Sequence, residues 1–493
     1  MSNGFEPTDP TLFNLAAKAV EEGISKVRKL KEDKKYIGTY FNFPQMYHFE
    51  NGIPNFSTSS FSGPTDYKEA FGRRDDKCLR LDSIPSFVTL FNYIDHADTV
   101  PGSRVRDYFS SSETETQTET VTRTESGLYR GLLDRLVTSM VDRYIHLHED
   151  APFTVEQFAA IYQPLESAVF NEVLPVEIVI PILFIKFSFD SVAITDNASI
   201  ERMSADFQLA RYKIGSNSMG ISSTVLGAST HALVLKGWEL KNHRFYEAFN
   251  AFYIASGYPT DQIDKFFTAV RIVTGASTGY AQLLLRPDGW AHDHEAHLPP
   301  VEGTSVRRYP IWFENHYWLT PHLPTLTTQQ ATEIGDVFGK LQASEDKRIL
   351  IATQRLNLCL IRETEEDSIL DATIAMEALL SDDERQEMTH KLALRMAALL
   401  SLSKTGQQTP VEVFRAVKQI YRYRSAVVHG SAKTTDKHEI AVSDKEKIPT
   451  VTLAINYLRM AINILIDNPQ YLKASKIDEE LILGNTTRSA KES

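Results

Sequence analysis

The chain has 493 residues, of which 42% are hydrophobic and 24% charged, and its formal net charge is −12. Such a composition is typical of a globular protein of about two to four domains. An acidic chain cannot coat nucleic acid with an overall basic surface, so any contact with nucleic acid must use a local basic patch.

The cysteine content and the apolar stretches predict the compartment. Cys78 and Cys359 are too few and too far apart for a disulfide framework or a cysteine-rich zinc site, which indicates a reducing, cytoplasmic compartment. Residues 1–10 lack the basic and apolar regions of a secretory signal. The most apolar stretch, 173–192, is interrupted by prolines and charged residues, so we expect strands there and no contact with a membrane.

The N-terminal part of the chain alternates between helical and irregular patterns. Residues 11–32 have apolar side chains at three-to-four spacing and predict an amphipathic helix. Residues 35–101 mix aromatics with Gly, Pro and Ser and predict short strands and loops. The Ser, Thr and Glu run at 110–126 predicts an exposed loop or linker, and a periodic helix follows at 127–148.

The middle of the chain mixes strands and helices. β-Branched and aromatic residues predict strands within 176–194, at 230–238 and at 280–285, and the apolar spacing predicts a helix at 261–273.

Helical patterns dominate from Thr327 onward, which predicts a domain boundary near 325–340. The expected fold class is therefore α+β multidomain. A mixed α/β region at 1–330, with room for two subdomains, has a sensing or regulatory role. An all-α bundle follows at 331–475 and a polar tail at 476–493.

Four helices are predicted within that bundle, at 371–380, 384–402, 411–429 and 451–465. The last has one apolar stripe over four turns: Val451, Ile455, Leu458, Ile462 and Leu465. The third opens with Pro410 and closes at Gly430, as expected for the two ends of a helix.

The 411–429 helix carries an arginine within its apolar stripe. That stripe consists of Val413, Val417, Ile420 and Val427, with Arg424 in its middle. A guanidinium does not lose its charge, so Arg424 must meet a carboxylate, a phosphate or a partner subunit. Glu377 is a candidate counter-ion because it also interrupts an apolar stripe. A buried structural ion pair is the alternative.

The opposite face of the same helix is basic. It carries Arg415, Lys418, Arg422, Ser425 and His429, again at three-to-four spacing. The negative end of the helix dipole favours a protonated His429, and a histidine can act as general acid or base near neutral pH. A surface histidine that only caps the helix is the alternative. About 140° around the helix separates Arg424 from His429, so the two would meet only at the helix end or across a symmetric pair of helices.

Residues 421–430, Tyr-Arg-Tyr-Arg-Ser-Ala-Val-Val-His-Gly, resemble the active-site helix of HEPN-domain ribonucleases, whose motif is Arg, a polar residue, several variable residues and His. Residues 369–380, with Ala-Met-Glu-Ala-Leu-Leu at 375–380, and residues 391–400 resemble the ApeA-like branch of that family. That branch is linked to abortive-infection defence against phage. The resemblance covers about residues 345–470.

This resemblance implies a helical bundle that dimerises through the motif helices, with a composite site at the dimer cleft. It implies RNA cleavage without metal or other cofactor, in which the 2′-hydroxyl attacks the adjacent phosphate. His429 would move protons and Arg424 would stabilise charge on the phosphate. Ser425 matches the polar motif position, and Glu377 matches a glutamate common in the branch. The strip of Arg415, Lys418 and Arg422 would bind RNA.

The expected partners are RNA, with tRNA among the candidate substrates, a second copy of the chain and an unidentified phage-derived trigger. The alternative function is a non-catalytic HEPN-type binding or dimerisation module in a regulatory or defence complex. A third hypothesis is a metal site at His292, His294 and His297, but the flanking prolines favour a surface loop. The sequence contains no phosphate loop, dinucleotide-binding fingerprint or serine-hydrolase motif.

Overall fold

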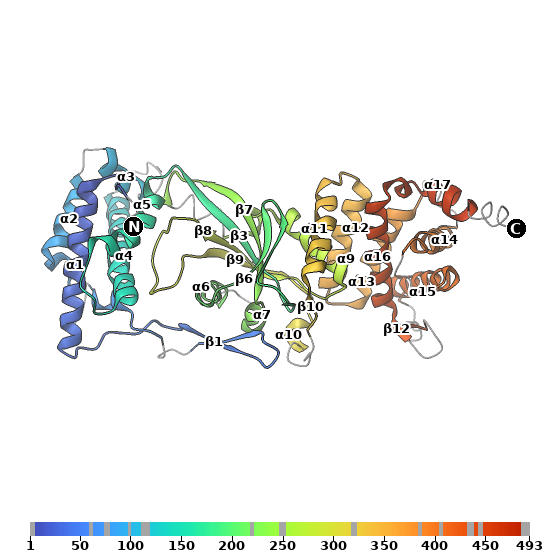
Figure 1. Ribbon diagram of the computed structural model, residues 1–493, viewed down its shortest axis with the longest axis horizontal. Helices are drawn as coiled ribbons and strands as arrows, with labels where there is room; N and C mark the ends of the chain where they lie inside the picture. Colours follow the sequence, from blue (N-terminus) through green and yellow to red (C-terminus); the bar gives the residue numbers. More distant parts are fainter. Residues whose placement is uncertain are drawn as a thin grey trace. The chain divides into compact units, whose positions relative to one another are not determined.

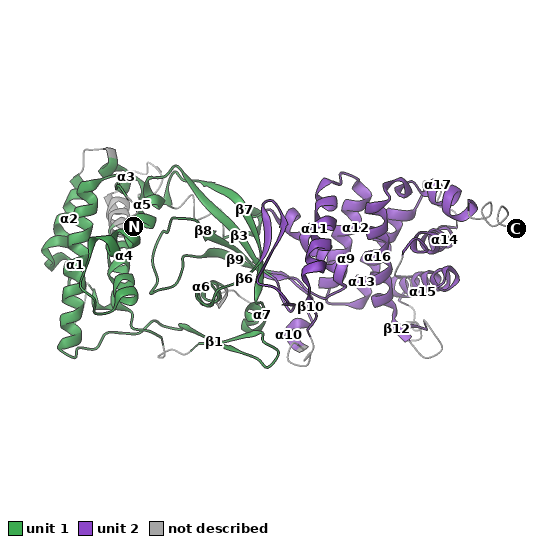
Figure 2. Cartoon of the chain, viewed as in Figure 1, with its two compact units in different colours: residues 1–181, 201–258, 282–306 green, residues 182–200, 259–281, 307–493 purple. Residues whose placement is uncertain are grey.

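The computed structural model is a mixed α and β protein whose chain forms two compact units (Figures 1 and 2). The first unit contains residues 1–181, 201–258 and 282–306, and the second contains 182–200, 259–281 and 307–493. The second unit therefore includes two segments that precede the boundary expected near 325–340. The structure describes residues 5–58, 63–72, 79–96, 100–109, 119–216, 221–245, 253–316, 323–382, 387–403, 408–430, 438–441 and 447–484.

The first unit begins with helices that share one apolar core. Helix α1 (Pro10–Glu32) starts at Asp9, whose carboxylate accepts the backbone N–H groups of Thr11 and Leu12. It packs against α2 (Pro85–His96) and α4 (Glu119–His148), and α4 also packs against α5 (Val155–Phe170) (Figure 1). The predicted helix at 11–32 is confirmed.

Two predictions in this region are partly wrong. Only the hairpin of β1 (Pro44–His48) and β2 (Pro54–Thr58) agrees with the strands expected at 35–101, because the later part forms α2 and α3 (Val100–Phe109). The buried aromatic face of α2 gains its partner from α1, which the local pattern does not reveal. Residues 110–118 of the predicted loop lie outside the described residues, and the chain is helical from Glu119. Extending a helix costs little once packing has fixed part of it.

A six-stranded sheet has the strand order β5-β6-β7-β3-β8-β9. Its central strand β3 (Val173–Pro181) pairs antiparallel with β7 (His231–Lys241) and β8 (Tyr280–Pro287). The strands predicted at 176–194, 230–238 and 280–285 are confirmed, although the first region also forms β4 (Lys186–Phe187) and β5 (Ser191–Thr195). The remaining strands are β6 (Ala198–Arg202) and β9 (Glu302–Arg308), and short helices α6 (Ala205–Ser216) and α7 (Ser223–Gly227) follow β6.

The second unit contains the C-terminal helices. They are α9 (Thr260–Thr274), α11 (Thr328–Ala343), α12 (Lys347–Ile361), α13 (Glu365–Leu380), α14 (Met388–Leu400), α15 (Pro410–Val428) and α16 (Thr450–Asp467). Helix α16 contacts each of the others in this set, because its apolar stripe lies in the middle of the bundle. The helices predicted at 261–273, 371–380, 411–429 and 451–465 are confirmed, and α14 is shorter than the predicted 384–402, of which 384–386 lie outside the described residues.

Several short elements complete the unit. They are α10 (Phe313–His316), β10 (Thr325–Leu326), the β11–β12 hairpin (Glu439–Ala441 and Lys447–Pro449), a 3-10 turn at Pro469–Leu472, α17 (Ala474–Lys476) and a π-helix at Ile477–Leu483. The segment expected as a polar tail from 476 thus begins with an ordered turn. Ile477 is buried there, and Asp478 accepts two hydrogen bonds from Arg395 of α14. In the described part of the chain, no helix is long and apolar enough to cross a bilayer.

Candidate functional site

Helix α15 carries five of the seven residues singled out from the sequence, a sixth, His429, caps its C-terminus, and both of its ends are well defined. At the N-terminus the Thr409 hydroxyl accepts the Glu412 backbone N–H, while the Glu412 carboxylate accepts the Thr409 backbone N–H at 2.7 Å. This reciprocal capping satisfies donors that the first turn leaves free. At the other end the His429 backbone N–H bonds to the Ser425 carbonyl at 3.1 Å, and Gly430 takes a left-handed conformation with φ 59°.

The inward face of α15 is apolar, as the sequence predicts. Val413, Val417 and Ile420 are buried and contribute to the packing of α15 against α13, α14 and α16. Val427 is only partly buried, because it lies in the last turn of the helix. This packing fixes the direction in which Arg424 leaves the helix.

Arg424 faces Glu377 of α13. The Arg424 Nη2 and Glu377 Oε1 atoms are 3.8 Å apart, with 34% of the arginine and 25% of the glutamate side chain exposed. That separation permits an ion pair but is too long for a hydrogen bond. The Arg424 Nε is buried and donates no hydrogen bond to the described residues. The guanidinium therefore keeps unused hydrogen-bonding capacity.

Tyr421 completes this cluster and was not singled out from the sequence. Its ring is buried, and its hydroxyl donates to the Thr373 carbonyl on α13 at 3.4 Å. Burial raises the pKa of Tyr421 well above its ordinary value, and the nearby Glu377 carboxylate raises it further. The only sequence signal was its position three residues before Arg424, on the same side of the helix.

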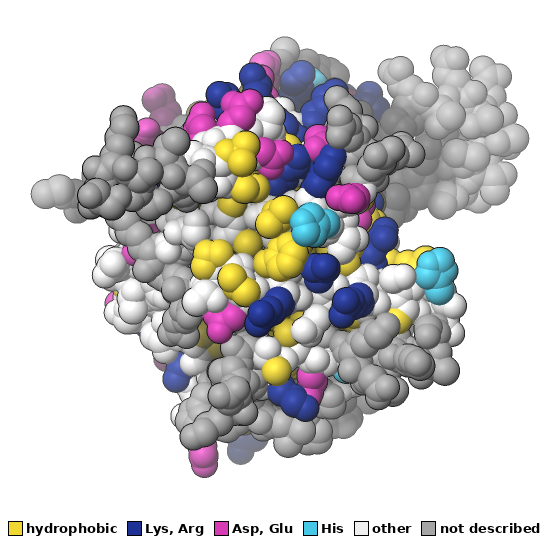
Figure 3. Space-filling view, turned by 90° about the vertical axis from the view of Figure 1, so that its right-hand side faces the viewer, with side chains coloured by type: hydrophobic (Ala, Val, Ile, Leu, Met, Phe, Trp, Pro, Cys, Tyr) yellow, Lys and Arg dark blue, Asp and Glu magenta, His cyan; other side chains and the backbone are white. Residues whose placement is uncertain are grey.

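The outward face of α15 is basic and accessible. Arg415, Arg422, Ser425 and His429 are exposed, and Lys418 is half-buried with its Nζ 5.3 Å from the Phe414 ring centroid. Within the described residues, Arg415, Lys418 and Arg422 form no ion pair. Figure 3 looks onto the face of the second unit that carries α14, α15 and α17, where Lys and Arg side chains lie beside apolar ones. The exposed apolar side chains of α14 and α15 are Leu394, Val411 and Val428.

One chain does not bring Arg424 and His429 into contact. The described interactions join Arg424 to Glu377 of α13 and leave the His429 side chain exposed at the end of α15. The two residues thus lie on different sides of one helix, as the sequence spacing predicts.

The His292, His294 and His297 segment forms a loop, as predicted, but it is not a surface loop. His292 Nε2 contacts the Tyr108 hydroxyl at 3.0 Å, and His294 Nε2 contacts the Ile161 carbonyl at 2.9 Å. His297 Nε2 lies 3.9 Å from Asp206. The three rings are held by different partners, and the described residues contain no group of three that could hold a metal ion. His294 is 4% exposed because the loop packs onto α4 and α5.

Comparison of the chain with models of protein families, with curated proteins and with solved structures gave no match.

Proposed function

We propose that the C-terminal helices form a HEPN-type, metal-independent endoribonuclease. The supporting observation is a single capped helix, α15, that combines an exposed terminal histidine and a half-exposed Arg424 with three cations that form no ion pair with the described residues. This is the local basic patch that a chain of net charge −12 would need in order to contact RNA.

The proposed reaction is an internal transesterification. The RNA 2′-oxygen forms a bond to the adjacent phosphorus, the bond from phosphorus to the 5′-oxygen breaks, and a 2′,3′-cyclic phosphate and a 5′-hydroxyl remain. His429 takes the proton from the 2′-hydroxyl or supplies one to the leaving 5′-oxygen. Arg424 donates to the phosphate oxygens as negative charge builds on them, and Glu377 orients the guanidinium. Ser425 contributes a hydroxyl beside Arg424.

Because Arg424 and His429 diverge on one helix, the proposed active unit is a homodimer that pairs two α15 helices. We further propose that the enzyme is a cytoplasmic toxic effector of abortive infection, held inactive by residues 1–330 until a phage-derived trigger arrives. The defence role rests on the resemblance of 369–380 and 391–400 to the ApeA-like branch.

A non-catalytic binding or dimerisation module is the second candidate, and one observation favours it. Glu377 already provides Arg424 with a counter-ion inside one chain, so the arginine has a structural explanation that requires no phosphate. In that function His429 only caps α15.

The test compares the wild-type chain with His429→Ala, each incubated with total RNA and with tRNA in the presence of a chelator. The control is His96→Ala, because His96 is also an exposed histidine at the C-terminal end of a helix but lies in the first unit. Circular dichroism checks that all three proteins are folded.

We expect the wild type and His96→Ala to leave cyclic phosphate ends and His429→Ala to leave the RNA intact. Equal cleavage by wild type and His429→Ala would contradict the assignment of the histidine. No cleavage by any of the proteins, even with lysate of phage-infected cells as the source of trigger, would favour the binding module.

A further inference from the structure

The first unit contains a cavity that the proposed ribonuclease does not use. Its volume is about 410 Å³, within the usual range for a small-molecule site. Its walls come from the 3-10 turn Tyr67–Ala70, from α4, from α6 and from the segment 287–302. All of the lining residues belong to the first unit.

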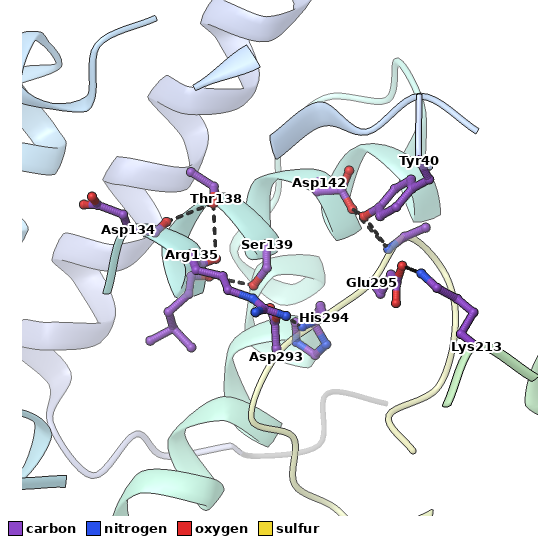
Figure 4. A network of polar contacts seen from close by, with 12 residues as sticks. Tyr40, Asp134, Arg135, Thr138, Ser139, Asp142, Lys213, Asp293, His294 and Glu295 are labelled. Atoms are coloured by element: carbon purple, nitrogen blue, oxygen red, sulfur yellow. Dashed lines mark hydrogen bonds and ion pairs between the residues drawn. The ribbon is translucent and has the colours of Figure 1, made fainter. Parts of the chain in front are cut away.

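A buried carboxylate holds these walls together. Asp142 of α4 is fully buried, and its Oδ2 accepts hydrogen bonds from the Tyr40 hydroxyl at 2.5 Å and the Ala296 backbone N–H at 3.1 Å (Figure 4). Its Oδ1 accepts the Tyr67 backbone N–H at 2.9 Å. Ala296 adopts a left-handed conformation with φ 45°, which is strained for a residue with a Cβ. One side chain therefore fixes both the 292–297 loop and the turn that carries Lys68.

Three cations line the cavity. Arg135 pairs with Asp293, and Lys213 contacts Glu295, both seen in Figure 4. Burial lowers the pKa of Lys213 to about 8, and Lys68 and Arg135 contribute to this shift because they repel a third positive charge.

The charge of Lys68 is offset in part by the nearby Asp66 carboxylate. The Lys68 Nζ lies 4.8 Å from the Tyr40 ring centroid, and within the described residues it forms no ion pair. Lys and Arg side chains that repel one another and face a cavity favour an anion that binds several N–H donors at once. Because a guanidinium has five N–H donors, the pair with Asp293 uses only part of the hydrogen-bonding capacity of Arg135.

Glu302 differs from the other carboxylates of the cavity. It is half-buried, and in the described part of the chain it has neither an ion pair nor a hydrogen bond. Burial, together with the nearby Asp293 carboxylate, raises the pKa of Glu302 to about 7. A carboxyl group in this position can accept from, or donate to, a polar group of a ligand. Apolar side chains of Ile214, Leu298 and Val301 complete the lining.

We infer that this cavity binds a small phosphorylated molecule whose organic part carries N–H donors, the chemistry of a nucleoside monophosphate. Lys68, Lys213 and Arg135 bind the phosphate, and Glu302 binds the N–H donors of the organic part. The inference does not depend on the proposed ribonuclease, because no residue of α15 takes part.

Isothermal titration of the full chain with the four common nucleoside 5′-monophosphates, their nucleosides and inorganic phosphate tests this site. We expect at least one monophosphate to bind and its nucleoside to bind at least about tenfold more weakly. Binding of none of the monophosphates, or equal binding of a nucleoside and its phosphate, would overturn the inference.

The matched variants are Lys68→Gln, Lys213→Gln and, as control, Lys236→Gln. Lys236 lies on β7 in the same unit, pairs with Glu201 at 2.8 Å and does not line the cavity. We expect about tenfold weaker binding for the first two and no change for the control. Lys213 packs over the Tyr40 and Phe43 rings, so the folding of Lys213→Gln must be checked by thermal unfolding. If Lys213→Gln is unfolded, the result for Lys68→Gln alone tests the site. If Lys236→Gln weakened monophosphate binding as much as the other two variants do, the ligand would be attracted by the general positive charge of the protein, which would contradict a specific site.

The Glu302→Gln variant distinguishes binding of the organic part of the ligand from binding of its phosphate. We expect this variant to bind the nucleoside monophosphate more weakly and to bind inorganic phosphate with the affinity of the wild type. If both ligands lose the same affinity, Glu302 does not contact the organic part and that half of the assignment fails.

Discussion

Arg424 and Glu377 form the one ion pair that links α15 to α13 among the described residues, with 3.8 Å between Nη2 and Oε1. A pair this exposed contributes only about 0.2–1 kcal/mol to stability. This gain in stability is small for a guanidinium that interrupts an apolar stripe. Under the proposed function, the pair is the resting arrangement of an arginine whose remaining donors bind the RNA phosphate.

The Arg424–Glu377 pair can be tested by substitutions that keep side-chain size. We expect Arg424→Lys and Glu377→Gln each to lower the free energy of unfolding in urea by less than about 1 kcal/mol. If Arg424 stabilises a developing phosphate charge, Arg424→Lys should lower the rate of RNA cleavage by about a hundredfold, as loss of an oxyanion donor does.

The structural alternative predicts the reverse. If Arg424 only holds α13 against α15, Arg424→Lys should cost several times more stability and leave binding of a partner intact. An unfolded Arg424→Lys protein would exclude the interpretation of a weak resting pair.

The basic strip of α15 should set the salt dependence of RNA binding. We expect Arg415→Gln and Arg422→Gln each to weaken RNA binding and to reduce the slope of log affinity against log salt by about one. Because both side chains are exposed, stability should change by less than about 0.5 kcal/mol. Lys347→Gln, on α12, is the control, because Lys347 is an exposed cation of the same unit that forms no ion pair with the described residues. An unchanged slope in both strip variants would place the RNA elsewhere.

Asp142 should be one of the most sensitive positions of the first unit. Asp142→Ala leaves the Tyr40 hydroxyl and the Tyr67 backbone N–H without their acceptor and removes one of the two acceptors of the Ala296 N–H, so we expect a loss of about 3 kcal/mol or more in thermal or urea unfolding. Tyr40→Phe removes a hydroxyl that donates to Asp142 and accepts from the Ala296 N–H, but Ala296 keeps Asp142 as an acceptor, so the variant should cost about 1 kcal/mol.

Tyr47→Phe is the matched control, because the Tyr47 hydroxyl bonds to Gln45 at the surface and the residue is 53% exposed. We expect it to change stability by less than about 0.5 kcal/mol. Equal effects of Tyr40→Phe and Tyr47→Phe would show that the buried network is not a stabilising centre.

Glu302 should make stability depend on pH. Its folded-state pKa of about 7 exceeds its ordinary value of 4.5, so the folded state holds the proton more tightly. Stability of the wild type should therefore fall, relative to Glu302→Gln, as pH rises from about 4.5 to 7, by about 3 kcal/mol in total. Urea unfolding at several pH values measures this difference, in which contributions of the buried histidines cancel. Parallel curves for the two proteins would show that Glu302 is not buried as described.

The helices with a continuous apolar stripe could be predicted from the sequence. Helices α1 and α16 each bury one stripe, so the spacing of their apolar residues reports the structure directly. Helix α2 could not be predicted, since its aromatic residues fit a strand equally well and only the contact with α1, far away in the sequence, selects the helix.

The same limit applies to the candidate sites. Glu377 could be predicted as the partner of Arg424, because each interrupts an apolar stripe and such charges need one another. Tyr421 could not, because its hydroxyl meets a carbonyl 48 residues earlier in the chain. The hydrogen bond between Asp142 and Ala296 spans 154 residues, and the 292–297 loop looks like surface until that contact is known.

The packing of the C-terminal helices depends on α9, which is encoded in the middle of the gene. Phe266 of α9 and Phe338 of α11 are fully buried with ring centroids 5.9 Å apart, and Asn357 of α12 donates to the Asp264 carbonyl and the Thr268 hydroxyl. A fragment that starts near residue 331 would lose these partners and expose the Phe338 ring. Recombination could not transfer a stable bundle by moving only the C-terminal part of the gene, because the bundle also requires residues 259–281.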